Sequence, residues 1–178
     1  GPRDVILWNP PPRDKTRDAT PDEESFDIDT DDGPDSEAEG DDEEFIAERV
    51  PASVEAPKVF NHLTSRDIRT LLFCESRKLT ELSIQRADDH RRTNPREYDR
   101  STTVGREAYN AGLGRRTRHS REHQFKTGVL TGLATTSALE LGIDIGSLDA
   151  TVLMGYPGQR QSFWQRIGRA GREASRSV

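Results

Sequence analysis

Short apolar runs alternate with longer amphipathic segments along most of this chain. Polar or glycine-containing loops follow the runs, a pattern typical of strands that are buried on both faces of a sheet. Strands are predicted at five places, residues 4–8, 69–74, 104–109, 129–135 and 149–154. Helices are predicted between them, at residues 52–64, from a cap at Ser76 to about Arg91, and at 115–127, 137–141 and 162–172. Strands separated by helices indicate an α/β fold with a mostly parallel sheet and helices on both faces.

Charge is divided between an acidic tract and a basic remainder. Residues 14–48 hold 17 of the 32 acidic and 2 of the 26 basic residues, a net charge of −15, so the other 143 residues carry +9. We expect the tract to be a disordered, solvated insertion, because a strand-to-helix connection normally takes about 2–6 residues. The basic remainder suits a polyanionic partner. We therefore divide the chain into a first strand and loop at 1–13, the insertion at 14–48 and the rest of one domain at 49–178.

The predicted helix at 162–172 carries cations on one face. It begins with a capping box, Ser162 followed by Gln165. At about 100° per residue, Gln165, Arg169 and Arg172 fall within roughly 60° of one another, and apolar side chains gather on the opposite side. No acidic residue lies in this segment. Guanidinium groups without nearby partners would suit a planar anion such as phosphate.

Three loops that follow predicted strands carry polar motifs. In open parallel sheets, ligands collect at the carboxyl ends of the strands. The motifs are "LLFCESR" at 71–77, "TTSALELGIDIG" at 135–146 and "QRIGRAGR" at 165–172. In this order and spacing they resemble motifs IV, V and VI of superfamily 2 helicases, and the chain is similar to DEAD/DEAH-box DNA-repair helicases related to the mitomycin-repair factor. The resemblance implies a second RecA-like domain, a three-layer sandwich of the P-loop NTPase type.

The resemblance also implies roles at a nucleotide site. Arg169 and Arg172 match the arginine fingers that reach the γ-phosphate of ATP, and Gln165 matches a residue that senses nucleotide. Gly142 matches a position where the chain turns closely, and Asp144 matches a contact to the ribose. Phosphoryl transfer needs positive charge where negative charge develops, and two guanidinium groups would supply it.

Four further residues match positions at a nucleic-acid backbone. They are Ser76 and Arg77 in the first motif, and Thr136 and Ser137 in the second. Hydroxyls and cations at phosphate spacing suit a groove that tracks a strand. A simple helix cap remains an alternative for Thr136, because Ser and Thr cap helices routinely.

Other residues have more than one interpretation. The basic stretch at 115–121 could bind phosphates or form a solvated helix face. Tyr156 and Trp164 could stack a base, although packing beside the last helix is the favoured interpretation. Glu140 is interpreted as structural, and the single cysteine, Cys74, as a buried strand residue.

An enzyme of this kind needs a phosphate-binding loop that this sequence lacks, since no lysine follows a glycine. We expect that loop, and the main hold on Mg²⁺, on an N-terminal RecA-like domain. The expected cofactor is therefore ATP with Mg²⁺, with no metal site in this chain, and the expected partners are that domain and DNA rather than a membrane. The fragment, which ends soon after motif VI, should be inactive alone. A cytoplasmic location is expected, because no signal peptide or membrane-spanning run occurs.

Two other functions remain open. One is a nucleic-acid-binding or regulatory module that kept the fold and lost catalysis, and the other is half of an RNA helicase. A phosphate loop and an acidic box within about two hundred residues upstream, about one domain's length, would favour the enzyme over the module.

Overall fold

A computed structural model describes residues 5–6, 49–98, 104–140, 145–146 and 148–171 of the chain. Residues 9–50 form one unit, of which Arg49 and Val50 are described, and the remaining residues form a second unit that contains every helix and strand below. Its helices are α1 (Ala52–Thr64), α2 (Arg77–Thr93), α3 (Arg115–Lys126), the 3₁₀ turn η1 (Ser137–Leu139) and α4 (Arg160–Ile167). Its strands are β1 (Thr70–Phe73), β2 (Arg106–Tyr109), β3 (Gly132–Thr135) and β4 (Ala150–Leu153). None of the helices in these ranges is long and apolar enough to cross a membrane.

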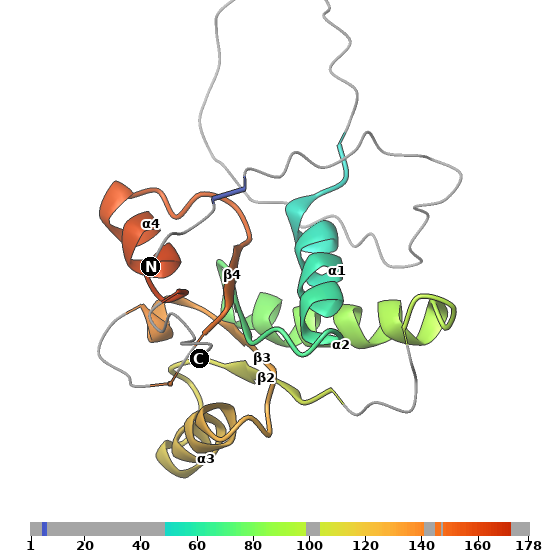
Figure 1. The fold of residues 1–178 in the computed structure, drawn as a ribbon. Helices are drawn as coiled ribbons and strands as arrows, with labels where there is room; N and C mark the ends of the chain where they lie inside the picture. The colour runs from blue at the N-terminus through green and yellow to red at the C-terminus, as the bar shows by residue number, and fades with distance from the viewer. Residues whose placement is uncertain (1–4, 7–48, 99–103, 141–144, 147, 172–178) are drawn as a thin grey trace, which may run out of the picture. The chain divides into compact units, whose positions relative to one another are not determined.

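The four strands form one parallel sheet in the order β2-β3-β1-β4 (Figure 1). The central strand β1 is paired on both sides, so that Leu72 stands beside Ala134 of β3 and Val152 of β4. The expected α/β fold with a parallel sheet is confirmed. The strand predicted at 4–8 is wrong where it can be checked, because Val5 and Ile6 are exposed and belong to no strand.

Apolar side chains cover both faces of the sheet, which explains why the strands have no polar alternation. Alternate residues of β1 point to opposite faces, so that Leu71 and Phe73 belong to one core and Leu72 to the other. The first core also contains Phe125 of α3, and the second contains side chains of α1 and α2. Figure 1 shows α3 on one side of the sheet and α1 and α2 on the other. The helices therefore lie on both faces, as the sequence predicts.

Helix α1 accommodates Pro57 in its interior. Proline has no N–H, so the carbonyl of Ser53, four residues earlier, loses its helical partner. Arg86 of α2 donates to that carbonyl at 2.7 Å instead. The carbonyl of Ser53 therefore keeps a hydrogen-bond partner despite the proline, and the same hydrogen bond links α1 to α2.

Close approach of α1 to the sheet depends on a glycine in β3. A Cβ on Gly132 would stand 2.5 Å from Cζ of Phe60 and 2.8 Å from Cγ2 of Thr64. Both of those side chains belong to α1 and are buried. Only a residue without a Cβ therefore fits here without moving α1.

The last helix differs from its prediction. Helix α4 begins two residues earlier than predicted, after an N-cap at Gln159, so Ser162 lies inside the helix and forms no capping box. It ends at Ile167 with Gly168 as C-cap, and the chain then turns so that the N–H of Gly171 donates to the carbonyl of Leu148. The predicted helix to residue 172 is therefore wrong, because the glycines end it early.

Candidate nucleic-acid and nucleotide interface

The carboxyl ends of the four described strands meet at one edge of the sheet, because all of the pairings are parallel. In spatial order, this edge carries the segments that begin at Asn110, Thr136, Cys74 and Met154. The motif IV segment follows β1 and the motif V segment follows β3, and these two strands are neighbours. The fold thus brings the predicted nucleic-acid residues to one edge.

Arg77, the first residue of α2, extends toward the loop that follows β2. Ser76 caps α2 as predicted, and its Oγ accepts a hydrogen bond from the N–H of Leu79 at 3.2 Å. Nη1 of Arg77 lies 3.0 Å from the position that a Cβ on Gly112 would occupy, and the side chain of Asn110 accepts from the N–H of Gly112 at 3.0 Å. The guanidinium therefore reaches the loop after β2, although β3 lies between β1 and β2 in the sheet. No predicted site residue lies in this loop, although its Asn-x-Gly pattern is a turn signal.

Thr136 and Ser137 are the first two residues after β3, at this edge of the sheet. Thr136 stands at the N-cap position of η1, but its side chain makes no capping hydrogen bond. The simple helix-cap interpretation of Thr136 is therefore wrong. Thr136 is half-buried and Ser137 is exposed.

Cys74, the first residue after β1, is a buried residue, as predicted. The pKa of its thiol is raised to about 11, because burial raises it. A hydrogen bond between the thiol and Ser83 lowers the pKa by a smaller amount. The thiol is therefore neutral at physiological pH and is not a nucleophile.

Motifs V and VI are joined at Glu140. Nε of Arg169 donates to the main-chain oxygen of Glu140 at 3.1 Å, and its Nη2 donates to the same oxygen. The side chain of Glu140 is used separately, because Nε and Nη2 of Arg166 both lie 2.6 Å from its Oε1. One residue of motif V thus holds two arginines of motif VI.

The Glu140–Arg166 pair is largely removed from solvent. The side chains are 11% and 12% exposed, and the guanidinium carbon of Arg166 stands 5.2 Å from the ring centroid of Phe73, a buried residue of β1. The structural interpretation of Glu140 is therefore confirmed. The expectation that the arginines lack partners is wrong for Arg166 and Arg169, because their partner comes from a distant part of the chain.

The predicted nucleotide residues do not share one helix face. Gln165 lies half-buried in α4, whereas Arg169 lies beyond the end of that helix. Gly142, Asp144 and Arg172 lie outside the described residues.

The aromatic residues beside motif VI are exposed. Tyr156 is 63% and Trp164 is 55% exposed, and Phe163 lies between them with a ring centroid 5.9 Å from that of Tyr156 and 5.6 Å from that of Trp164. Tyr156 therefore packs beside the last helix through its contact with Phe163, as the favoured interpretation predicts, while more than half of the Tyr156 and Trp164 surfaces stays exposed.

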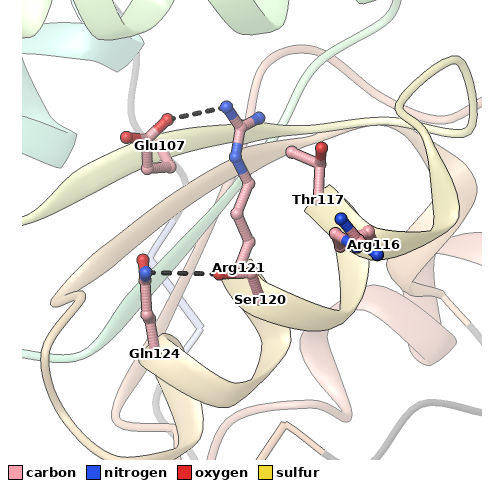
Figure 2. A pocket seen from close by; sticks show the side chains of 6 residues that line it. All are labelled: Glu107, Arg116, Thr117, Ser120, Arg121 and Gln124. Atoms are coloured by element: carbon pink, nitrogen blue, oxygen red, sulfur yellow. Dashed lines mark hydrogen bonds and ion pairs between the residues drawn. The ribbon is translucent and has the colours of Figure 1, made fainter.

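A separate pocket of about 330 Å³ lies between α3 and the edge strand β2, and Figure 2 shows its lining. Arg121 from the basic stretch at 115–121 points to Glu107 of β2, with 3.0 Å between Nη2 and Oε2. Gln124 donates to Ser120 in the same pocket at 3.4 Å. Since Glu107 offsets one of the cations, this pocket is a mixed-charge surface, which favours the solvated-face interpretation of the stretch.

Comparison with known proteins identifies the fold and its relatives. The helicase conserved C-terminal domain family matches residues 55–174. The chain is 36% identical over 124 residues to the ATP-dependent helicase hrq1 of Schizosaccharomyces pombe, covering 70% of this chain and 11% of that protein. It is 31% identical over 130 residues to the uncharacterized ATP-dependent helicase YprA of Bacillus subtilis, covering 73% and 17%.

Solved structures give the same result. The crystal structure of the DUF1998 helicase MrfA bound to DNA is 31% identical with a TM-score of 0.60, covering 70% of this chain and 16% of that one. The structure of Mycobacterium smegmatis helicase Lhr bound to ssDNA and AMP-PNP is 27% identical with a TM-score of 0.56, covering 68% and 15%.

The chain spans less than a fifth of the length of these relatives. The family match covers most of it, including the whole described sheet and all three motifs. The resemblance to superfamily 2 helicases and the RecA-like fold are thereby confirmed, and the chain belongs to the helicase conserved C-terminal domain family.

Proposed function

We propose that this chain is the C-terminal motor domain of an ATP-dependent DNA helicase or translocase. In this proposal the carboxyl edge of the sheet contacts the backbone of a single strand, and motif VI contacts the nucleotide. The observation that carries the proposal is the position of Arg77, Ser76, Thr136 and Ser137 along one edge of the sheet. Three residues after Ser137, the main-chain oxygen of Glu140 accepts a hydrogen bond from Arg169. DNA is favoured over RNA because MrfA and Lhr are described as bound to DNA and ssDNA.

The strand contact in this proposal is electrostatic and independent of sequence. Arg77 would supply a cation beside the loop after β2, and Thr136 and Ser137, which follow β3 at the same edge, would supply hydroxyl donors for phosphate oxygens. An extended guanidinium and neighbouring hydroxyls suit successive phosphates of one strand. The exposed carboxylate of Glu75 lies at the same edge, against the loop after β4, so it would repel phosphates on that side of Ser76.

The nucleotide contact would come from Arg169 and Gln165, with Arg172, Gly142 and Asp144 in the roles that the family resemblance implies. The fork of Arg169 suits a phosphate, and it is already fixed on the main chain of motif V. Glu140, whose main-chain oxygen supports Arg169, lies only four residues after Thr136. A bound nucleic-acid strand that displaces Thr136 would therefore also move this support. We infer that residues 136–140 couple strand binding to the position of the arginine finger.

The rest of the enzyme lies outside this chain in this proposal. ATP would be held between motif VI and an N-terminal RecA-like domain, which would provide the phosphate loop and the main hold on Mg²⁺. When bound, ATP supplies the phosphoryl group whose hydrolysis drives movement. A role in DNA repair and a cytoplasmic location remain part of the proposal, on the family resemblance and the sequence.

The strand contact can be tested on the chain itself. Its affinity for single-stranded DNA should fall with salt, and Arg77→Ala should reduce the log–log slope by about 0.7, the value for one lost phosphate contact on a single strand. Arg92→Ala is a matched control, because Arg92 is an exposed arginine at the other end of the same helix, about 22 Å away at 1.5 Å per residue.

The proposal requires that the two variants differ. An unchanged slope with Arg77→Ala, or an equal change with Arg92→Ala, would remove Arg77 from the strand path. The isolated chain should also hydrolyse no ATP, and steady hydrolysis by the pure chain would contradict a nucleotide site shared with another domain.

A further inference from the structure

The exposed rings of Tyr156 and Trp164 and the half-buried ring of Phe163 between them form an aromatic surface, which we call the aromatic platform. Tyr156 comes from the loop after β4, and the other two come from the first two turns of α4. The Tyr156 and Phe163 rings are inclined by 33°, and the Phe163 and Trp164 rings meet edge to face at 78°. More than half of the Tyr156 and Trp164 surfaces face solvent, whereas aromatic residues of the two cores are buried.

The platform adjoins the proposed strand path. Oε1 of Glu75, beside Ser76, lies 2.8 Å from the position that a Cβ on Gly155 would occupy, so the loops after β1 and β4 touch. Gly155 has φ +81°, which favours glycine and turns the chain directly into Tyr156. A strand that follows the sheet edge past Ser76 would therefore arrive at the platform.

Apart from Glu75, whose carboxylate lies beside Gly155, the charge of the segment that carries the platform suits a polyanion. Residues 150–171 contain no Asp or Glu and contain three arginines. Glu140 is the partner of Arg166 and Arg169, whereas Arg160, at the start of α4, is exposed and has no ion-pair partner within the described ranges. A cation beside exposed rings is the combination by which proteins bind single strands, with the cation near a phosphate and a ring against a base.

We propose that the aromatic platform stacks a base of the single strand whose backbone follows the Arg77–Ser76 edge. This inference rests on the proposed function, since the ligand is the same strand, and it adds a contact to bases to the contacts with phosphates. Stacking is tolerant of sequence because every base has a flat face, so the platform would hold the strand without selecting a site. Trp164, which has the larger ring system, and Tyr156 provide the exposed faces.

The experiment compares a thymidine strand of about 12 nucleotides, within the usual range for such binding surfaces, with an abasic strand of the same length and charge. The protein carries Trp8→Phe, which leaves Trp164 as its only tryptophan, since the sequence has two. The thymidine strand should bind about 5- to 150-fold more tightly than the abasic strand, and only the thymidine strand should quench the emission of Trp164.

Substitutions assign that preference to the platform. Tyr156→Leu and Trp164→Leu should reduce the preference for the thymidine strand, with the abasic strand bound as before, and Trp164→Phe should keep most of it. For the affinity comparison these variants are made in the protein with Trp8 retained. Val129→Ala is the control, because Val129 is an apolar residue with 65% exposure before the amino end of β3, and it should keep the whole preference.

The outcomes separate this inference from the proposed function. Equal binding of the two strands by the starting protein, or equal loss for both strands in the leucine variants, would overturn stacking and leave the phosphate contacts intact. Quenching of Trp164 by ATP without a strand, to the same extent, would assign the rings to the adenine and also overturn the proposal. Failure to bind either strand would contradict both the stacking and the proposed function. The quenching of Trp164 tests the stacking even if a leucine variant does not fold.

Discussion

Removing the carboxylate of Glu140 should destabilise the domain more than removal of a surface charge. The Glu140→Ala variant leaves the guanidinium of Arg166 without its acceptor, in a place where its side chain is 12% exposed. Breaking a buried pair from one side costs about 3–5 kcal/mol. Arg166 keeps its position over the Phe73 ring and a small exposure to water, so we expect a loss of about 2–4 kcal/mol in the free energy of unfolding.

The side chain is the only part of this residue that the variant changes. The main-chain oxygen of Glu140, which accepts from Arg169, remains in the alanine variant. A loss of stability would therefore report on the Arg166 pair and not on the Arg169 contact. In a chain of this length, the melting temperature should fall by about 2–4 °C for each kcal/mol.

A double-mutant cycle isolates the interaction. Urea denaturation of the wild type, Glu140→Ala, Arg166→Met and the double variant should give a coupling energy of about 2 kcal/mol or more. The Asp89–Arg92 pair is the control, because its side chains are 57% and 77% exposed, and its coupling should be about 0.5 kcal/mol or less. A Glu140–Arg166 coupling as small as that of the control would refute the argument that the pair is shielded from water.

Three further predictions follow from other parts of the chain. Gly132→Ala should cost about 1–3 kcal/mol in unfolding free energy because its Cβ would overlap Phe60, whereas Gly114→Ala, with open space around it, should change stability little; equal effects would contradict the tight α1 contact. In the intact protein, Arg169→Ala should lower ATP hydrolysis about 10³- to 10⁵-fold while nucleotide binding remains, and a loss of less than about tenfold would show that this arginine does not reach the γ-phosphate. Deletion of residues 14–48, with their net charge of −15, should leave the domain folded and raise strand affinity most at low salt; equal affinities across a salt series would leave only a role in solubility.

The sheet could be predicted from the sequence because its strands are buried on both faces. In β1, Leu71 and Leu72 point to different cores, so the strand appears as an unbroken apolar run. The ends of the strands could not be predicted as well, because apolar residues continue beyond the residues that pair with a neighbouring strand. Val129, for example, belonged to the strand predicted at 129–135 but is exposed, and β3 begins at Gly132.

The candidate site was predictable in its location and not in its contacts. Parallel strands place the loops after them at one edge, so Ser76 and Thr136 could be brought together by topology alone. The partner of Arg166 lies 26 residues earlier in the chain, and no local pattern links the two. The capping signal at Ser162 was misleading because α4 begins two residues earlier, at Arg160, without a side-chain cap.

The central place of β1 has a consequence for synthesis of the protein. Leu72 pairs with Ala134 and Val152, so the middle strand is made first and its two neighbours follow about 60 and 80 residues later. At about 5–20 residues per second, a ribosome needs roughly 4–16 s to add the second neighbour. Both edges of β1 are open to pairing with other nascent chains until β3 is made, and the edge that pairs with β4 stays open until β4 is made. The order of strands therefore leaves one edge of the sheet exposed to aggregation until β4 has emerged.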